Sequence, residues 1–245
     1  MNETKFCALI LAAGKGTRMQ SDKAKVLHEL NGKPLLHYSI EAAKAAGAEK
    51  IVAVIGHQAE RVRETFTANG CIFVEQNPQL GTGHAVLQAK DVLSNYDGLT
   101  VILCGDVPLL KSSTIQSLID NHHTYCAAVS VLTTVPPPPH AYGRIVKDDR
   151  GNVLKIVEHK DATEEEKKIG EINTGIYCAD TKFLFDALGK VTNNNQQGEY
   201  YLTDIVEIAV REGKKVKSFI ADDYVEVMGI NTLEELARAE KHLLT

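Results

Sequence analysis

The chain has 245 residues, of which 27 are Lys or Arg and 32 are Asp or Glu, so its formal net charge is −5 at pH 7. This balance excludes a general nucleic-acid-binding role, because no basic excess is available to neutralise a phosphate backbone. No apolar run approaches the roughly 18 residues that a membrane-spanning helix needs. The amino terminus has no signal-peptide pattern and the five cysteines have no Cys-x-x-Cys spacing, so we expect a cytoplasmic protein with reduced, buried thiols and no membrane partner.

The first part of the chain alternates β-rich apolar runs with helical patterns. We expect strands at 5–11, 50–55, 71–74, 99–104 and 126–133, and helices at 34–46, 58–67, 82–93 and 112–122. Alternation of this kind predicts βαβ units around a mainly parallel sheet. Because the runs are almost continuously apolar, the sheet should be covered on both faces. The expected fold class is α/β, with a Rossmann-like mixed, mainly parallel sheet flanked by helices.

The pattern changes near residue 135. The stretch "VPPPPHAYG" predicts a loop, since proline cannot donate to the ladder of a central strand. Beyond it we expect a hairpin turn at "DDRGN", strands at 144–147, 153–158 and 172–180, and helices at 163–168, 181–189, 203–212 and 232–245. No internal repeat is found. These patterns predict a single domain over 1–231, with halves of about 1–135 and 136–231, followed by a C-terminal helix at 232–245.

A glycine loop follows the first expected strand, in "LILAAGKGTRM". Gly14 and Gly16 permit positive φ and close approach of a ligand to the backbone, so successive N–H groups can bind an anion. Four cations follow within a short distance: Lys15, Arg18, Lys23 and Lys25. A dinucleotide fingerprint is excluded because Met19 stands in place of its third glycine, and the Walker pattern is absent. The loop is either a phosphate site or an ordinary tight turn with solvated cations.

Asp106 comes shortly after the apolar run 99–104. The carboxyl ends of parallel strands face the ligand crevice of an α/β sheet. Mg²⁺ prefers oxygen ligands and is usually held by one or two protein groups in addition to phosphates and waters. Asp106 is therefore a candidate magnesium ligand, with a turn-capping aspartate as the alternative.

Several motifs together resemble one family. They are "LAAGKGTRM" with Lys25 in "KAKVL", then "EQNPQLGTGHA", "LCGDVPLL", "YGRIV", "IVEHKDAT", "EINTGIY", "NNNQQGEYYLTDI" and "EVMGINT". From Phe6 to about Leu244 the chain is similar to the uridyltransferase domain of the bacterial bifunctional N-acetylglucosamine-1-phosphate uridyltransferases, which have the nucleotide-diphospho-sugar transferase fold. Two departures are Ala24, where the family often has proline, and the loop Pro136–Pro139. The hexapeptide repeats of a left-handed β-helix acetyltransferase domain are not found.

The resemblance implies a reaction and its participants. UTP and N-acetylglucosamine 1-phosphate would give UDP-N-acetylglucosamine and pyrophosphate by Mg²⁺-dependent direct displacement at the α-phosphate. The first half would bind the nucleotide and the second half the sugar. Since the β-helix is missing, we expect no acetyl transfer, and a monomer or weak dimer. The alternatives are a thymidylyl- or cytidylyltransferase, an NAD-binding oxidoreductase, and a non-catalytic nucleotide-sugar-binding protein.

The resemblance also assigns roles to individual residues. Arg18 and Lys25 would be catalytic, with Lys15 and Lys23 as helpers, and Asp106 and Asn231 would hold Mg²⁺. Asn231 follows the strand-like run 224–229, so in a parallel sheet it could meet Asp106 over one crevice. The nucleotide would be bound by Leu11, Ala12, Ala13, Gly14, Lys15, Gly16, Gln76, Gly81, Thr82, Cys104 and Gly105, among which Gln76 and Gly81 would read uracil. The sugar would be bound by Gly143, Glu158, Asn173, Tyr201 and Thr203. Two alternatives stay open: His84 is either a neighbour of the base or a structural histidine, and Asn231 is a metal ligand, the N-cap of the last helix, or both.

Overall fold

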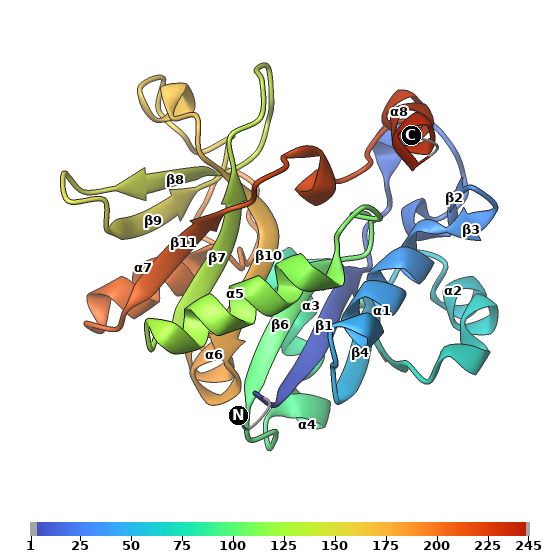
Figure 1. Ribbon diagram of the computed structural model, residues 1–245, viewed down its shortest axis with the longest axis horizontal. Helices are drawn as coiled ribbons and strands as arrows, with labels where there is room; N and C mark the ends of the chain where they lie inside the picture. Colours follow the sequence, from blue (N-terminus) through green and yellow to red (C-terminus); the bar gives the residue numbers. More distant parts are fainter. Residues whose placement is uncertain (1–3, 244–245) are drawn as a thin grey trace.

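The structure is a computed structural model that describes residues 4–243. Within them a mixed sheet forms the centre, in the strand order β11-β7-β10-β6-β1-β4-β5 (Figure 1). These strands are β1 (Phe6–Ala12), β4 (Lys50–Ile55), β5 (Ile72–Glu75), β6 (Leu99–Cys104), β7 (Val129–Thr134), β10 (Ile172–Asp180) and β11 (Val216–Ile220). β10 runs antiparallel to its neighbours β6 and β7, whereas the other pairs in this order are parallel. The expected mixed, mainly parallel α/β sheet is confirmed.

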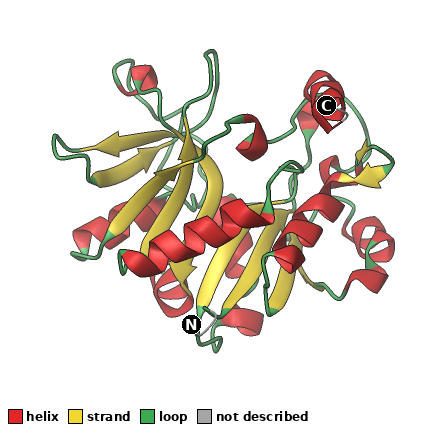
Figure 2. Cartoon of the chain, viewed as in Figure 1, coloured by secondary structure: helices red, strands yellow, loops and turns green. Residues whose placement is uncertain are grey.

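Helices cover both faces of the sheet (Figure 2). The side chains of β1 alternate, so Ala8 and Ile10 pack on one face, Cys7 and Leu9 pack on the other, and all four are fully buried. The first face is covered by α1 (Leu35–Ala45), α2 (Ala59–Thr65) and α5 (Ser112–Thr124). The second face is covered by α3 (Thr82–Leu87), α4 (Lys90–Leu93), α6 (Thr181–Leu188) and α7 (Asp204–Arg211). Because both faces are buried, the strand needs an unbroken apolar run.

A hairpin branches from the start of β10. It consists of β8 (Arg144–Lys147) and β9 (Val153–Val157), which pair antiparallel, and β8 touches β10 (Figure 1). The Asp148 carboxylate closes the turn, because its Oδ1 accepts from the N–H groups of Arg150 and Asn152 at 2.9 and 2.8 Å. The expected strands and their turn are confirmed.

The predicted helix 82–93 is wrong as one element. The structure has α3 and α4 instead, which are separated around Ala89. The N–H groups of Gln88 and Ala89 bond to carbonyls three residues back, which tightens the chain out of the α-helical pattern. The Gln88 side chain also donates to the His84 carbonyl at 2.9 Å, an oxygen that a continuing α-helix would use itself.

The predicted helix 163–168 is also wrong in extent, since the structure has only a 3-10 turn, η4 (Glu166–Lys168). The start of this turn is well capped: Glu166 Oε2 accepts from the Thr163 N–H at 2.9 Å, and Thr163 Oγ1 accepts from the Glu166 N–H at 3.2 Å. The turn ends because the Ile169 N–H bonds to Glu166 three residues back, and Ile169 is already extended toward β10.

The segment after α7 departs most from the prediction. The structure has a strand here, β11, that the sequence analysis did not predict. Its sequence "VKSFI" is only partly apolar, as suits a strand at the sheet edge. The strand-like run 224–229 is not a strand, since Val225–Val227 forms a 3-10 turn, η5. The expected C-terminal helix is present as α8 (Leu233–Leu243), and its expected positions 244–245 lie outside the described residues.

α8 packs on a short hairpin that was not expected from the sequence. The hairpin is formed by β2 (Glu29–Leu30) and β3 (Lys33–Pro34). Leu30 and Ala239 belong to one small buried cluster there, which also contains Ile230. This cluster ties the C-terminal helix to the segment that follows the glycine loop.

The two expected halves share one sheet. β7 precedes residue 135, yet it lies between β10 and β11, which both follow that residue. A cut near residue 135 would separate hydrogen-bonded neighbours. The halves are therefore not separate folding units.

Two expectations drawn from composition can be compared with the fold. All five cysteines are free, but only Cys7 and Cys178 are buried as expected. Cys126 is exposed because it lies in a turn after α5, with φ at 47°. Among residues 4–243, no helix is both long and apolar enough to cross a membrane.

Candidate active site

The candidate site lies at the edge of the sheet where β1 and β6 end. These strands are parallel and in register, with Leu11 opposite Cys104, so the glycine loop and Asp106 emerge side by side. β10 runs the other way, with Tyr177 opposite Ile102, so its first residues reach the same edge. The topology thus brings together segments from both halves of the chain.

The two loop glycines have different surroundings. Gly16 has φ at 67°, and a Cβ there would stand 2.6 Å from Lys25 Cβ. Gly16 therefore allows the Lys25 segment to pack against the loop. A Cβ on Gly14 would have no atom within 4 Å, and Gly14 and Lys15 are exposed. The open side of the loop is thus at Gly14, where an anion can approach the backbone.

Two glutamines that were not singled out in the sequence brace this loop. Gln58 Oε1 accepts from the Ala24 N–H at 3.1 Å, and Gln58 Nε2 donates to the Asp22 carbonyl at 2.6 Å. Gln79 Nε2 donates to the Ala13 carbonyl at 3.0 Å. Ala24 stands where the resembled family often has proline, and a proline has no N–H to donate to Gln58. No local pattern could have identified these side chains, because their partners are distant in sequence.

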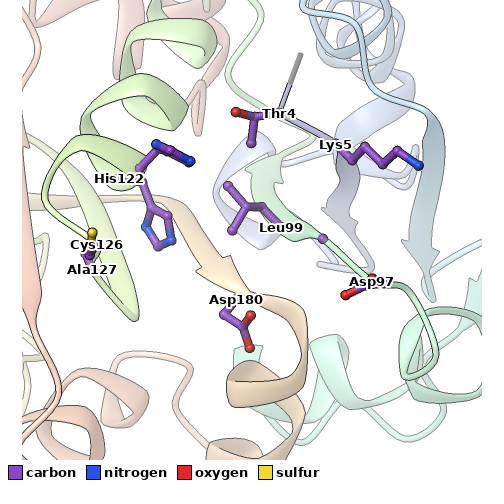
Figure 3. A pocket seen from close by; sticks show the side chains of 10 residues that line it. Thr4, Lys5, Asp97, Leu99, His122, Cys126, Ala127 and Asp180 are labelled. Atoms are coloured by element: carbon purple, nitrogen blue, oxygen red, sulfur yellow. The ribbon is translucent and has the colours of Figure 1, made fainter. Parts of the chain in front are cut away.

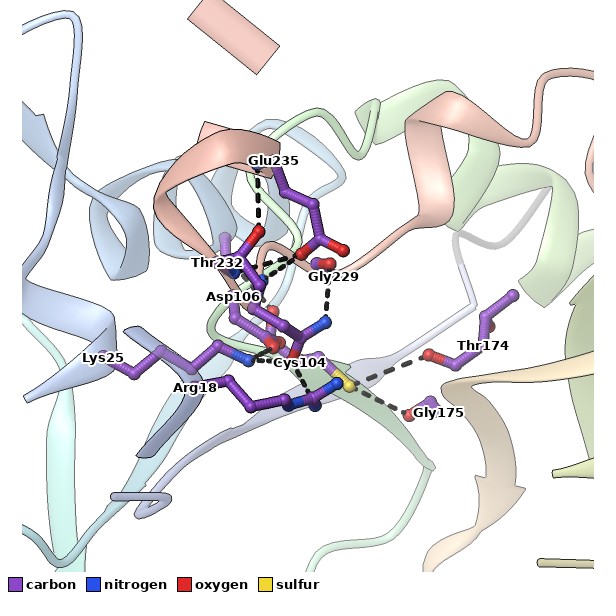
Figure 4. A network of polar contacts seen from close by, with 11 residues as sticks. Arg18, Lys25, Cys104, Asp106, Thr174, Gly175, Gly229, Thr232 and Glu235 are labelled. Atoms are coloured by element: carbon purple, nitrogen blue, oxygen red, sulfur yellow. Dashed lines mark hydrogen bonds and ion pairs between the residues drawn. The ribbon is translucent and has the colours of Figure 1, made fainter. Parts of the chain in front are cut away.

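Lys25 and Asp106 lie together at the centre of the site (Figure 4), where Asn231 also contacts Lys25. The Lys25 ammonium pairs with the Asp106 carboxylate and donates to Asn231 Oδ1 at 2.7 Å. Arg18 donates to the same Asn231 oxygen at 2.8 Å. The Ile230 N–H bonds to the Asp106 carbonyl at 2.9 Å, which holds the two segments together. Two side-chain oxygen acceptors and two cations therefore converge at one place.

Asn231 is not the N-cap of the last helix. Thr232 and Glu235 form the capping box, since the Glu235 N–H donates to Thr232 Oγ1 at 3.1 Å and Glu235 Oε2 accepts from the Thr232 N–H at 3.2 Å. Asn231 Nδ2 donates to the Gly229 carbonyl at 2.9 Å, so its Oδ1 is the atom that faces the cations. The N-cap alternative is therefore wrong, and metal binding by Asn231 stays a prediction.

A cavity of ≈ 260 Å³ joins this centre to the second half of the chain. It is lined by Arg18, Cys104, Asp106, Val107, Ala141, Tyr142, Gly143, Glu158, Asn173, Thr174, Gly175, Gly229 and Asn231. Burial raises the pKa of the Glu158 carboxyl, and the neighbouring Thr203 hydroxyl opposes this rise. Asn173 Oδ1 accepts from the Gly175 N–H at 3.0 Å, which leaves its Nδ2 as a donor. The cavity therefore combines one cation, Arg18, with the carboxyl and amide groups of Asp106, Glu158, Asn173 and Asn231.

Tyr201 and Thr203 do not line this cavity. The Tyr201 hydroxyl accepts from Gln197 Nε2 at 2.7 Å and donates to Asp161 at 3.1 Å. Thr203 Oγ1 is buried and lacks a hydrogen bond of normal geometry. Both residues lie near Glu158, which lines the cavity. Their contact with the sugar stays a prediction.

The glycines of "LGTG" serve a contact between the two halves. Gly81 has φ at 107°, and a Cβ there would stand 2.6 Å from the Tyr200 carbonyl oxygen. The Gly83 N–H donates to that oxygen at 2.7 Å, and the Leu202 N–H donates to Thr82 Oγ1 at 3.0 Å. The close packing against Tyr200 thus explains these glycines. Direct reading of a base by the Gly81 backbone stays a prediction.

Tyr142 is a lining residue that was missed in the sequence. Burial raises the pKa of its phenol to about 12, with Asp106 as the next cause, while the Gly229 N–H opposes the rise. The phenol is therefore protonated at neutral pH. Tyr142 also lines a hollow of ≈ 560 Å³ between the proline loop and α8, so it separates two spaces. Its place as the tyrosine of "YGR" was the available signal in the sequence.

Cys104 lines the cavity, and its sulfur faces Thr174 and Gly175 (Figure 4). Burial raises the pKa of its thiol to about 12, with Asp106 as the second cause. Its Sγ contacts the Gly175 carbonyl at 3.5 Å, and Gly175 has φ at 82°. The thiol stays neutral at physiological pH and fills space, which excludes it as a thiolate nucleophile.

Another hollow, of ≈ 400 Å³, lies at the opposite edge of the sheet (Figure 3). His122 is buried there and bonds to Ser130 at 2.9 Å through its Nδ1. Burial lowers the pKa of His122 to about 4, so it is neutral. In the described part of the chain, no group of three or more His, Cys, Asp or Glu side chains is arranged to hold a metal ion.

Comparison with known proteins gives relatives over most of the chain. The bifunctional protein GlmU of Geobacillus thermodenitrificans is 49% identical over 96% of this chain and 51% of that protein. GlmU of Geobacter metallireducens is 50% identical over 96% of this chain and 49% of that protein, and GlmU of Listeria monocytogenes is 48% identical over 97% and 52%. The chain thus spans about half the length of the curated relatives it matches.

A solved structure and a family description agree with the architecture. The crystal structure of UDP-glucose pyrophosphorylase complexed with UDP-glucose superposes with a TM-score of 0.77 over 98% of both chains, at 19% identity, so the fold is shared. Residues 8–166 match the family described as "MobA-like NTP transferase domain". This match includes the glycine loop, Lys25 and Asp106, and it covers more than half of the chain. The chain belongs to the MobA-like NTP transferase family.

Proposed function

We propose that this chain transfers UMP from UTP to N-acetylglucosamine 1-phosphate, forming UDP-N-acetylglucosamine and pyrophosphate. The observation that carries the proposal is the cavity in which Arg18, Asp106 and Asn231 meet Glu158 and Asn173. A cation, together with oxygens that can hold a metal ion, suits a triphosphate. A buried carboxyl and an amide suit the hydroxyl and acetamido groups of a sugar. Both kinds of group are needed if two substrates react in one space.

The chemistry of this proposal is a direct displacement. A phosphate oxygen of the sugar 1-phosphate forms a bond to the α-phosphorus of UTP, and the bond from that phosphorus to the oxygen leading to the β-phosphate breaks. Pyrophosphate leaves with the electron pair of that bond. The second pKa of a phosphate monoester is about 6, so the attacking oxygen is already an anion at pH 7 and needs no general base. The side chains have to hold two anions in line and stabilise developing charge.

Arg18 and Lys25 fit this electrostatic role. A guanidinium can hold two phosphate oxygens at once, and an ammonium acts as a compact point charge. Arg18 is exposed toward the cavity, and Lys25 is partly buried beside it. When substrates bind, both can exchange their contact with Asn231 for phosphate oxygens.

Asp106 and Asn231 fit a divalent cation. Their oxygens converge on the Lys25 ammonium, so this place already stabilises positive charge. One carboxylate and one amide oxygen form a hard ligand set that suits Mg²⁺, which takes its other ligands from phosphates and water. Gly229 leaves room for an ion beside Asp106, because any larger residue would place its Cβ 3.0 Å from Asp106 Oδ2. We propose Mg²⁺ as the ion, which when bound would neutralise charge on the reacting phosphates.

The choice of UTP and of the N-acetyl sugar is supported by the motifs. "EINTG" and "NNNQQGEYYLTD" resemble the N-acetylglucosamine-specific branch of sugar nucleotidyltransferases, and the relatives at 48–50% identity carry the name GlmU. A thymidylyl- or cytidylyltransferase would share the fold and the glycine loop. The two proposals differ in the base and the sugar that are accepted.

A substrate-matrix assay tests the proposal. Pyrophosphate release is measured with UTP, dTTP, CTP and ATP, each combined with N-acetylglucosamine 1-phosphate and with glucose 1-phosphate, in the presence of Mg²⁺. We expect the largest kcat/KM for UTP with the N-acetyl sugar. A larger value for dTTP or CTP would replace the proposal by the corresponding transferase, and no release with any pair would reject catalysis.

A further inference from the structure

The Gln76 side chain is held in one orientation. Gln76 follows β5 at the same sheet edge as the glycine loop, and it is only 4% exposed. Its Nε2 donates to the Gly81 carbonyl at 2.9 Å and lies 3.1 Å from His84 Nδ1. The Gly81 carbonyl can only accept, so the amide nitrogen must face it. With both amide hydrogens used, only Oε1 remains for another partner.

This arrangement bears on which ring nitrogen of His84 carries the proton. Its Nδ1 accepts from Gln76, so in the neutral ring the proton is on Nε2. Nε2 lies 3.1 Å from Gln88 Nε2, which also donates to the His84 carbonyl at 2.9 Å. A neutral ring accepts at only one nitrogen, and the buried Gln76 needs that acceptor, whereas the half-buried Gln88 can turn its second amide hydrogen to solvent. The acceptor atom of the ring is therefore the one that faces Gln76.

The orientation of the Gln76 amide matters for a pyrimidine. Uracil and thymine carry a hydrogen on N3, whereas N3 of cytosine is an acceptor. An amide oxygen facing N3 bonds to the first two and meets the lone pair of the third. A freely rotating amide would offer its nitrogen to cytosine and lose this discrimination.

We infer that His84 is a specificity-determining positioning residue: by accepting from Gln76 it keeps the amide oxygen turned toward the base, which favours UTP over CTP. This inference rests on the proposed function, because it takes Gln76 to face the base of the bound nucleotide. In this role His84 need not touch the base or the phosphates. Its effect reaches the substrate through the orientation of one amide.

The test compares kcat/KM for UTP and CTP, with N-acetylglucosamine 1-phosphate as acceptor. His84→Leu removes the acceptor, and we expect the UTP/CTP preference to fall about 3- to 10-fold, as for the loss of one neutral hydrogen bond. His84→Asn places an amide oxygen near the position of Nδ1 and should retain most of the preference. His84→Phe is a second acceptor-free variant that keeps a ring next to Tyr200, in case the leucine variant folds poorly.

A double-mutant cycle separates positioning from general structure. In a Gln76→Ala background, His84→Leu should leave the UTP/CTP ratio unchanged, because no amide remains to be oriented. If His84→Leu and His84→Phe lower both rates equally and preserve the ratio, the positioning role is wrong although the proposed function stands. If the wild-type protein itself shows no preference for UTP, both the proposed function and this inference fail.

Discussion

Arg18 and Asn231 are 213 positions apart in the chain, yet the guanidinium donates to Asn231 Oδ1 at 2.8 Å. The contact connects the glycine loop to the segment that begins the last helix. It also shows that the Arg18 side chain reaches over the Asp106 edge of the sheet and does not extend into solvent away from it. The predictions on the catalytic centre follow from this geometry.

Arg18→Ala should lower kcat by about 10²-fold or more, while the KM for UTP changes little. The guanidinium is proposed to meet charge that grows in the transition state, and only such differential contacts raise kcat. Steady-state kinetics with UTP and the sugar 1-phosphate measures both constants. Arg18→Lys keeps the positive charge but loses the two-pronged guanidinium, so its kcat should lie between those of the wild type and Arg18→Ala. A raised KM with intact kcat would make Arg18 a binding residue only.

Asp106→Asn should raise the Mg²⁺ concentration needed for half-maximal rate and nearly abolish turnover. The substitution removes the only formal negative charge of the proposed metal pair, and it also removes the partner of Lys25. A Mg²⁺ titration of turnover measures the effect, with the melting temperature as a control for folding. Normal Mg²⁺ dependence in a folded variant would refute the metal site.

Asn231→Asp should act in the opposite direction on the metal. An added carboxylate would tighten Mg²⁺ binding and also strengthen the pairing with Lys25 and Arg18, so both cations would be less available to phosphates. We expect half-saturation at lower Mg²⁺ and a reduced but measurable kcat. An unchanged Mg²⁺ half-saturation would show that Asn231 does not contact the ion.

Gly14→Ala and Gly16→Ala form a matched pair. Gly16→Ala should lower the free energy of unfolding by about 1–3 kcal/mol, because φ is 67° and the new Cβ would stand 2.6 Å from Lys25 Cβ. Gly14→Ala meets no atom within 4 Å and should leave the unfolding free energy nearly unchanged. If the loop binds the triphosphate, Gly14→Ala should nevertheless raise the KM for UTP severalfold. Unaltered KM values would place the phosphates elsewhere.

Asp204→Asn should stabilise the protein at neutral pH. Burial raises the pKa of Asp204 from 3.8 to about 6, with Glu207 and Asp161 adding to the rise. The contribution of this carboxyl to stability is fully present below pH 4, where it is protonated in both states, and is lost as the pH rises through about 6. An asparagine cannot ionise, so we expect a gain of about 1 kcal/mol at pH 7.5, partly offset by the lost charge at the start of α7.

Urea unfolding at pH 4.5 and pH 7.5 measures this difference. The gain should be small at the lower pH and larger at the higher one. Asp186→Asn is the control, because Asp186 is exposed on α6. Equal gains at both pH values would show that Asp204 does not titrate in this range.

The parts of the fold that the sequence predicts are those with a strong local pattern. β1 and β6 are long apolar runs buried on both faces, and "DDRGN" specifies its own turn. β11 escaped prediction because an edge strand needs only partial burial. Helix 82–93 failed because one glutamine side chain competes for a backbone carbonyl, which periodicity does not reveal.

The site shows the same division. Asp106 and the glycine loop follow predicted strands, so their proximity can be deduced from a parallel sheet. Asn231 was expected beside Asp106 for a wrong reason, since the run before it is a 3-10 turn and not a strand. The contact that brings them together is a backbone bond from Ile230 to Asp106. The bracing by Gln58 depends on a partner 34 positions away, so it could not be predicted from one sequence.

The position of β7 in the sheet affects how the chain folds during translation. All six residues of this strand are buried, yet both of its hydrogen-bonding neighbours, β10 and β11, are synthesised later. During translation, the segment that forms β7 therefore lacks both of its strand partners until Ile172–Asp180 leaves the ribosome. A chain that stops before that point exposes a template for aggregation. The last hundred residues thus protect a strand made long before them, in addition to supplying half of the candidate site.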